Sequence, residues 1–509
     1  MGRSNLAALA AVLAGLPVTA PPAMAQPGAL DPTFGGDGTV TIAFDIPPEA
    51  VDQVETTGPG ATQLATLDPV PGVAGTLVAG LHGFDSANAL AVQPDGRILA
   101  VGLAGGAAGD TELAAARLLP DGSLDAGFGV GGRVVIEFDA GGEFSDAATG
   151  VVIQPDGGIV LCGGTLVDDL QGDVAVARLT PAGALDPAFG TSGRVVFGTE
   201  LGGPLYDLVF DCAVDPMGRI VVAGLVILST TNADFLVARL LADGALDPTF
   251  DTDGVTTVPF DLGGTGVDAA RALAIQPDGR IILAGLAEDA VPDYEVALAR
   301  LLVDGSLDPT FGAGGRVTVA LDLGGNLWDE ATDVGLAPDG RIVVAGKVAG
   351  ANGWDFLAAR FLADGTLDPS FGGDGWATAG FDLGGDLHDE GWALALQSDG
   401  KAVVVGGVET DLPAGSQDRD FGAVRFNGDG SLDLGFGVSG RTVVASGPDP
   451  SITGYAEAAA LQPDGRIVLG NESTDGENTD FLLARLNNDA IFADGFESGE
   501  TSAWSTTTP

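Results

Sequence analysis

A carboxylate recurs at one position of this 509-residue sequence, eight residues before six of the seven copies of a recurring Gln or its equivalent, with Gly454 as the exception. The residue before that Asp varies between aromatic, imidazole and small side chains. Aromatic faces beside carboxylates suit sugars or peptides. Repetition favours architecture instead, because an Asp at the start of a strand readily accepts loop N–H bonds. Both interpretations stay open for Asp85, Asp146, Asp207, Asp268, Asp329 and Asp389, and ligand binding would include Phe84, Tyr206, Trp328 and His388.

Catalytic patterns are scarce. The only histidines are His82 and His388, and neither lies in a Ser-His-Asp, metal-ligand or phosphate-loop pattern. Paired acids such as Asp389 and Glu390 are common in this composition, so they discriminate little. A hydrolase or lyase that uses two carboxylates at the rim is the enzymatic alternative. The many carboxylates allow weak calcium association, although no calcium-loop motif is present. No other metal and no cofactor are expected.

A hairpin motif must position these side chains. In L-A-I-Q-P-D-G-R-I-I-L-A-G, residues 273–285, two apolar runs flank Pro, Asp and Gly. Pro sets φ for the first corner, Asp bonds to nearby backbone and Gly adopts the left-handed conformation. The turn recurs about every 61 residues, which is typical of a repeat architecture. Its glycines are Gly96, Gly157, Gly218, Gly279, Gly340, Gly400 and Gly465.

A second motif, L-D-x-x-F, also occurs seven times and precedes a further strand. Each full unit therefore contains four antiparallel strands, which predicts a propeller blade. The chain begins with an L-D-x-x-F block that no hairpin precedes, and its last hairpin has no such block after it. The sequence thus predicts an all-β, seven-bladed β-propeller that is closed by the N-terminal strand, because closure removes exposed sheet edges.

An Arg lies eight residues before the Asp of six L-D-x-x-F blocks, as in Arg239 and Asp247. Across a three-residue turn this spacing places the two charges opposite each other. Arg485 has no such Asp after it and Asp31 has no such Arg before it. We expect these two residues to pair across the chain ends.

Composition and sequence segments bound the remaining possibilities. The formal net charge of −50 argues against binding nucleic acid or an anionic membrane surface. Residues 1–25 are typical of a secretory signal peptide, and no later segment is apolar for long enough to span a bilayer. We expect residues 26–488 to form the propeller, with a surface insertion at about 46–82, and residues 489–509 to form a mobile tail. Cys162 and Cys212 are expected to be buried thiols, with a disulfide as the alternative.

The units Q-P-D-G-R-I, A-R-L-L-x-D-G-S-L-D-P-T-F-G and G-R-V resemble the delta-60 repeat of bacterial secreted and surface proteins, over about residues 29–488. That resemblance implies a β-propeller and supplies no catalytic residues. We therefore expect an exported, monomeric binding or scaffolding module, at or beyond the cell surface, whose partner is an extracellular glycan or peptide. A polysaccharide-active enzyme and a structural adhesin are the alternatives.

Overall fold

The computed structural model describes residues 28–43, 85–105, 111–138, 145–168, 171–199, 206–229, 231–289, 293–321, 323–350, 353–381, 383, 388–409, 419–446, 454–474 and 479–488. These residues form 28 β-strands, and no helix occurs among them. The predicted all-β class is confirmed. The predicted signal peptide, the insertion at 46–82 and the tail at 489–509 lie outside the described residues. No described segment could cross a bilayer as an apolar helix.

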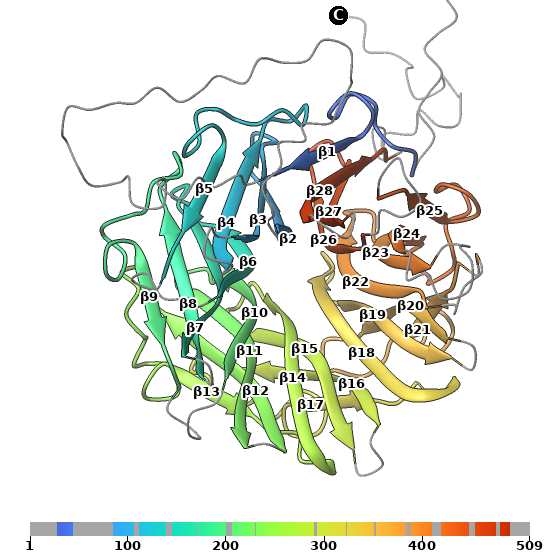
Figure 1. Cartoon of the computed structure of the whole chain (residues 1–509). Coiled ribbons are helices and arrows are strands. Elements are labelled where there is room, and N and C mark those ends of the chain that lie inside the picture. Colours follow the sequence, from blue (N-terminus) through green and yellow to red (C-terminus); the bar gives the residue numbers. More distant parts are fainter. Residues whose placement is uncertain are drawn as a thin grey trace, which may run out of the picture.

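The strands form seven antiparallel groups of four, here called blades 1 to 7, which are arranged around a common centre (Figure 1). The first, innermost strands are β2 Ser86–Val92, β6 Asp146–Ile153, β10 Asp207–Val214, β14 Gly263–Ile275, β18 Gly324–Leu336, β22 Glu390–Leu396 and β26 Ala456–Leu461. The second strands are β3 Ile98–Gly105, β7 Ile159–Asp168, β11 Ile220–Ser229, β15 Ile281–Asp289, β19 Ile342–Gly350, β23 Ala402–Glu409 and β27 Ile467–Thr474. The third strands are β4 Thr111–Leu118, β8 Gln171–Leu179, β12 Asn232–Leu240, β16 Tyr294–Leu301, β20 Gly353–Phe361, β24 Arg419–Phe426 and β28 Thr479–Leu486. The fourth, outermost strands are β5 Arg133–Ile136, β9 Arg194–Phe197, β13 Val255–Val258, β17 Arg316–Val319, β21 Trp376–Ala379, β25 Arg441–Val444 and β1 Thr39–Ile42.

The predicted hairpin joins the first and second strands of every blade. In blade 4 the N–H of Gly279 donates to the carbonyl of Gln276 at 2.8 Å, and Gly279 has a φ of 86°. Only Gly adopts this left-handed conformation without strain, which explains its recurrence. The other six turn glycines have φ between 83° and 86°.

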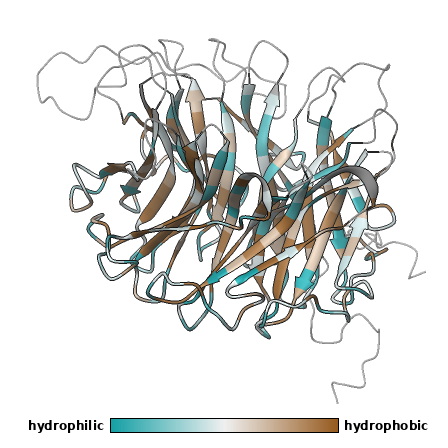
Figure 2. Ribbon diagram, turned by 90° about the horizontal axis from the view of Figure 1, so that it is seen from below, coloured by the Kyte–Doolittle hydropathy of each residue, from teal (hydrophilic) through white to brown (hydrophobic). Residues whose placement is uncertain are grey.

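The hydrophobic core lies between blades. Seven clusters of buried side chains occur in the described part of the chain, and each combines strands of two neighbouring blades. Figure 2 shows the corresponding hydrophobic residues along the strands. One cluster contains Phe34 and Ile42 from the N-terminal segment, Phe481 from blade 7 and Ile98 from blade 1. The first and last blades therefore share a core like those between the other blades.

The N-terminal strand is the fourth strand of blade 7. Strand β1 pairs antiparallel with β28, with Val40 opposite Leu483 and Ile42 opposite Phe481. Among the described residues no hydrogen-bonded sheet closes on itself, although short parallel pairings, Ala233 with Val267 and Tyr294 with Trp328, join blades 3, 4 and 5. The predicted charge pair forms, because Arg485 Nη2 lies 2.8 Å from Asp31 Oδ2.

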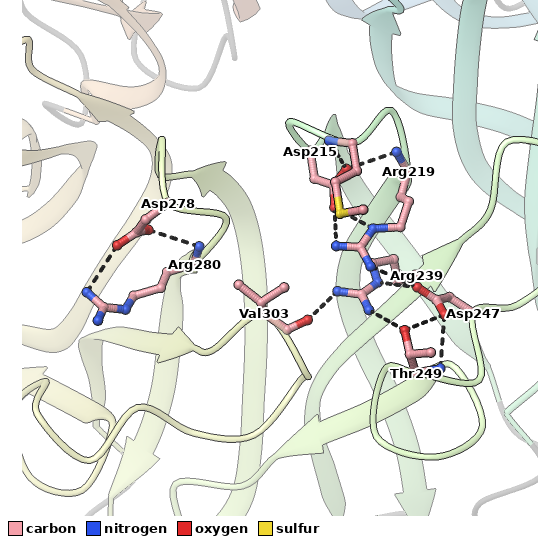
Figure 3. A network of polar contacts seen from close by, with 9 residues as sticks. Asp215, Arg219, Arg239, Asp247, Thr249, Asp278, Arg280 and Val303 are labelled. Carbon is pink, nitrogen blue, oxygen red and sulfur yellow. Dashed lines mark hydrogen bonds and ion pairs between the residues drawn. The ribbon is translucent and has the colours of Figure 1, made fainter.

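The recurring Arg connects each hairpin to the next blade. In blade 3, Arg239 Nε donates to Asp247 Oδ2 at 2.9 Å, Nη2 donates to Thr249 Oγ1 at 3.2 Å, and Nη1 donates to the carbonyl of Val303 in blade 4 (Figure 3). The guanidinium also lies 4.6 Å from the ring centre of Phe250. The two motifs thus form one unit that fixes each blade against its neighbour.

Both cysteines are free and buried. Burial and the neighbouring Cys212 raise the pKa of the Cys162 thiol well above its ordinary value. Two buried thiols are thus adjacent at the boundary between blades 2 and 3, where they belong to one hydrophobic cluster.

Candidate functional site

Every innermost strand contains a β-bulge at the same repeat position. In blade 4, Ala270 lies opposite Gly285 and Ala272 lies opposite Ala284, so Arg271 is the extra residue. A bulge bends its strand and redirects a side chain, and such bulges are enriched beside functional sites. The bulged residue differs in type between blades, except that Thr occurs twice: Asn88, Thr149, Phe210, Arg271, Thr332, Trp392 and Glu457.

The bulged residues meet in the central channel. A cavity of about 540 Å³ contains all seven of them among its lining residues. The other lining residues come from the start of two first strands and from the second and third strands: Ser86, Leu103, Thr111, Tyr455 and Glu472. Since the residues next to the bulge are mostly small, the bulged side chains give this cavity its chemistry.

A glycine on the second strand makes room for the bulge. At Gly285, a Cβ atom would lie 1.9 Å from the carbonyl oxygen of Ala269. Equivalent contacts of 1.7 to 1.9 Å occur in five other blades, at Gly102, Gly163, Gly224, Gly346 and Gly406. This close approach explains the terminal Gly of the hairpin motif.

We expect Gly285→Ala to lower the free energy of unfolding by about 1–3 kcal/mol, because β14 must shift away from the new methyl group. Chemical denaturation measures the loss. Gly36→Ala is the control, because nothing lies within 4 Å of a Cβ there, although its φ of 104° adds backbone strain. Equal stability of the Gly285→Ala and unsubstituted proteins would contradict the proposed need for space.

Charged side chains cluster at one side of the channel. Arg271 Nε lies 2.5 Å from Glu330 Oε1, and Lys347 Nζ lies 3.3 Å from Glu390 Oε2. Arg419 Nη2 also lies 3.3 Å from Glu390 Oε1. Apart from Arg3, these three cations are the only Lys or Arg residues outside the recurring Arg/Lys positions of the repeat. The repeat architecture explains the other Lys and Arg residues, but it does not explain why these three cations lie together.

An aromatic cluster accompanies these charges. The ring centres of Tyr294 and Trp328 are 4.4 Å apart, and those of Trp328 and Trp354 are 5.9 Å apart. Lys347 Nζ lies 5.2 Å from the ring centre of Trp354 and 4.0 Å from that of Trp392. The ring centre of Trp392 lies in turn 6.5 Å from that of Tyr455. All five rings are partly exposed, and Lys347 joins the group of three to the pair at the channel.

The recurring Asp residues bind loop backbone. Asp146 Oδ2 accepts the N–H of Phe138 at 2.9 Å, and Asp268 Oδ2 accepts that of Phe260 at 2.7 Å. All six of these Asp residues are buried, and none lines the cavity. The same loop contact recurs at Asp207, Asp329 and Asp389, whereas Asp85 accepts the N–H of Gly105. The architectural interpretation fits these contacts, and ligand binding by these carboxylates stays a prediction.

The residues before these Asp residues have different surroundings. Trp328 belongs to the aromatic cluster, and His388 forms a β-bridge with Trp354. Tyr206 lies against Gly172 of β8. Phe84 lies outside the described residues. Thus Trp328 and His388 both adjoin Trp354.

Burial raises the pKa of three carboxyls on the innermost strands. Burial and the neighbouring Glu472 raise the pKa of Glu457 to about 7. Burial also raises the pKa of Asp211 to about 7 and that of Asp333 to about 6. Asp211 and Asp333 follow bulged residues, and each accepts a backbone N–H of the next blade, from Leu273 at 2.9 Å and Leu394 at 2.6 Å.

These raised pKa values predict a loss of stability on the alkaline side. A carboxyl whose folded-state pKa is raised stabilises the fold most below its unfolded pKa of about 4, and this contribution disappears as pH rises through the folded value. We therefore expect the free energy of unfolding to fall between about pH 4 and pH 7 because of Asp211 and Asp333. Asp211→Asn with Asp333→Asn should reduce that slope, measured by denaturant titration at each pH. Asp278→Asn, on an exposed turn, should leave it unchanged, and equal slopes in all three proteins would contradict the assignment.

The site shows no arrangement for a protein-bound metal. Among the described residues, no group of three His, Cys, Asp or Glu side chains could hold a metal ion. The chemistry that the described cavity offers consists of hydrogen bonding, ion pairing, aromatic contact and proton transfer by Glu457 and Glu472.

The repeats match one family profile, described as Domain of unknown function (DUF5122) beta-propeller. Six matching segments begin at or near the hairpin turn and end at the Phe of the L-D-x-x-F block: residues 93–128, 154–189, 218–250, 276–311, 337–371 and 397–436. The seventh, residues 462–489, covers the last hairpin and ends after β28. The chain is built of propeller repeats. The predicted propeller repeat is thereby confirmed, and the profile assigns it no function.

Solved structures with similar folds differ widely in their described roles. One is a protein of unknown function from Dyadobacter fermentans, with 13% identity, a TM-score of 0.43 and coverage of 67% of this chain and 94% of that chain. The polysaccharide lyase Uly1 has 12% identity, a TM-score of 0.42 and coverage of 83% and 94%, respectively. A Trypanosoma rangeli sialidase in complex with sialic acid has 10% identity, a TM-score of 0.35 and coverage of 80% and 55%. No curated protein sequence matches the chain.

Proposed function

We propose that this propeller is an exported, monomeric module that binds an extracellular glycan or peptide in its channel cavity. The bulge ring carries this proposal. A repeat needs the same residue wherever a position has the same structural task, as at the turn glycines. The bulged position instead supplies Asn, Thr, Phe, Arg, Trp and Glu to one cavity. Such a mixture of polar and aromatic side chains around a cavity of about 540 Å³ is typical of a small-ligand site.

The aromatic cluster supports an extended ligand. Flat, partly exposed rings can stack on sugar rings or peptide side chains, and here they continue from the channel to Tyr294 at the start of β16. Lys347 contacts two of the tryptophans and thereby fixes their orientation. The ligand would therefore place one end in the cavity and lie along these rings.

Glycan and peptide arrays probed with the mature protein, with and without calcium, test the proposal. We expect binding of at least one ligand class, and loss of that binding in Trp392→Ala and Arg271→Ala proteins that retain the melting temperature of the unsubstituted chain. Met217→Ala is the control, because Met217 is 76% exposed on the turn of blade 3, at the other end of its strand. Binding that survives both cavity substitutions would exclude the cavity as the site.

A hydrolase or lyase is the second candidate, and one observation favours it. Glu457 has a pKa of about 7, and it lies beside Glu472 and Tyr455. A carboxyl that titrates near neutral pH can act as a general acid or base. Product analysis on any bound polysaccharide decides between the candidates, since turnover that Glu457→Gln abolishes would replace the binding module with an enzyme.

We also infer that β1 holds the ring closed. Its pairing with β28, the core shared by blades 7 and 1, and the Arg485 contact to the carbonyl of Pro120 in blade 1 support this role. The consequence for stability is tested by the truncation discussed below.

A further inference from the structure

The charges of the channel cavity are unevenly paired. Arg271, Lys347 and Arg419 each have a glutamate within 4 Å, supplied by Glu330 or Glu390. The cations near the channel therefore already have partners. An anionic ligand would have to compete with these glutamates for them.

Glu457 and Glu472 have no such partner. Within the described part of the chain, neither forms an ion pair. A neutral hydroxyl lies near each of them, Tyr455 beside Glu457 and Ser86 beside Glu472, and Ser86 also contacts Asn471 and Asn88. Both residues line the cavity, and they belong to adjacent strands of blade 7, β26 and β27. A partly buried carboxylate without a counter-ion is costly, so a cation in the cavity would be stabilised by both groups.

The cavity walls also suit a cation. Phe210 and Trp392 each have a cation of the protein over the ring, Arg271 at 4.8 Å and Lys347 at 4.0 Å from the ring centres. Aromatic faces attract cations through the ring quadrupole. The indole Nε1 of Trp392, which is buried, has no hydrogen-bond acceptor among the described residues. A ligand with an ammonium group and nearby hydroxyl or carbonyl oxygens would match both features.

We propose that the ligand bound in this cavity presents a protonated primary amine to Glu457 and Glu472. This inference rests on the proposed binding function and specifies its ligand class. The ammonium group donates three hydrogen bonds, enough to contact both carboxylates. Binding favours the ionised form of Glu457 and therefore releases a proton near neutral pH. Of the titratable and charged groups that act on Glu457, Glu472 opposes this ionisation, whereas Tyr455, Arg271 and Lys347 favour it.

Isothermal titration calorimetry with matched oligosaccharides tests the amine. The probes are a glucosamine tetramer and its fully N-acetylated counterpart, which differ in the amines alone. Trilysine and its acetylated form distinguish a peptide amine from an amino sugar. We expect the free amine of one pair to bind at least tenfold more tightly than the acetylated form. In buffers of different ionisation enthalpy, that binding should release a proton at about pH 7.

Substitutions separate the cavity from the general acidity of the chain. Glu457→Gln and Glu472→Gln should each weaken amine binding at least tenfold, and Glu457→Gln should abolish the proton release. Asp278→Asn with Asp339→Asn removes two charges at exposed turns, with side chains 55% and 53% accessible, and should change binding less than twofold. Melting temperatures check that the variants fold.

The outcomes are distinct. Equal binding of the amine and its acetylated form, or equal weakening by the turn substitutions, overturns the amine assignment. A neutral glycan that binds the cavity and is insensitive to Glu457→Gln also overturns it, while leaving the proposed binding function intact. If no array ligand depends on Trp392 or Arg271, the proposed function itself fails.

Discussion

A chain that lacks residues 26–45 is expected to have a much lower melting temperature than the full protein. This decrease should exceed the decrease that Asp31→Ala causes. The deleted segment contributes Phe34 and Ile42, which are 0% and 1% exposed. Truncating one such Phe costs about 3–5 kcal/mol, so removing the whole segment should cost more than about 5 kcal/mol. This is a large part of the roughly 5–15 kcal/mol that stabilises a typical domain.

The charge pair accounts for only part of that loss. Arg485 is 1% exposed, so Asp31→Ala leaves a buried guanidinium without its carboxylate, at a cost of about 3–5 kcal/mol. The hydrogen bonds of Arg485 to Thr33 and to the carbonyl of Pro120 remain and reduce this cost. The deletion also removes Thr33, which accepts one of these hydrogen bonds, and it exposes the edge of β28, where other chains can pair and aggregate.

Differential scanning calorimetry compares the full, truncated and Asp31→Ala proteins. A synthetic peptide of residues 26–45 should restore the melting temperature of the truncated chain, and the same peptide with Phe34→Ala should restore less. Asp37→Ala, at an exposed residue of the same segment, is the matched control and should cost far less than Asp31→Ala, because it removes only two solvent-exposed hydrogen bonds from Thr39 and no buried ion pair. A truncated protein that melts with the full one would contradict closure by β1.

The sequence predicted the architecture because the decisive requirements are local. A left-handed turn needs Gly, and an Arg eight residues before an Asp faces it across a short hairpin. The pairing of Asp31 with Arg485 followed from counting complete units at the two chain ends. These arguments need no knowledge of how blades meet.

The candidate site was less accessible to such reasoning. The recurring Asp residues attracted attention because they repeat, and the structure has them binding loop N–H groups. The side chains that line the channel lie at a β-bulge. Its one extra residue reverses the in-and-out alternation of side chains along the strand, so the sequence alone does not show which side chains face the channel. Lys347 reaches Trp392 from another blade, a contact that no spacing reveals. The sequence did contain a signal for this site. At one repeat position, five residues before the hairpin Gln, the residue type changes in almost every copy, whereas the positions around it recur.

Arg239→Ala is the second substitution with a large expected effect, about 3–5 kcal/mol of unfolding free energy. Arg239 is 2% exposed, and it binds Asp247, stacks on Phe250 and donates to the carbonyl of Val303 in the next blade (Figure 3). The substitution leaves Asp247 buried, with only Arg219 as a cation at 3.2 Å. Breaking such a pair leaves a poorly compensated charge, which explains the magnitude.

Two comparisons isolate the cause. Arg239→Lys should also destabilise, because an ammonium group cannot make the three directed contacts of the guanidinium. Arg178→Ala should cost less, because the Arg178 side chain is 13% exposed and its distance to Asp186 is 3.3 Å. A cost at Arg178 equal to that at Arg239 would show that burial is not the determining factor.

The acid limb of stability gives an independent test of the same pair. Burial alone would raise the pKa of Asp247, but hydrogen bonds from Thr249 and the charge of Arg239 outweigh it and lower the pKa to about 2. A lowered carboxyl pKa stabilises the fold above the unfolded value of about 4, and this contribution is lost as pH falls towards about 2. Arg239→Ala should therefore lose more stability at pH 6 than at pH 2.5, when unfolding is measured by urea at both. A destabilisation that is independent of pH would assign the effect of Arg239 to packing on Phe250 instead of to its charge.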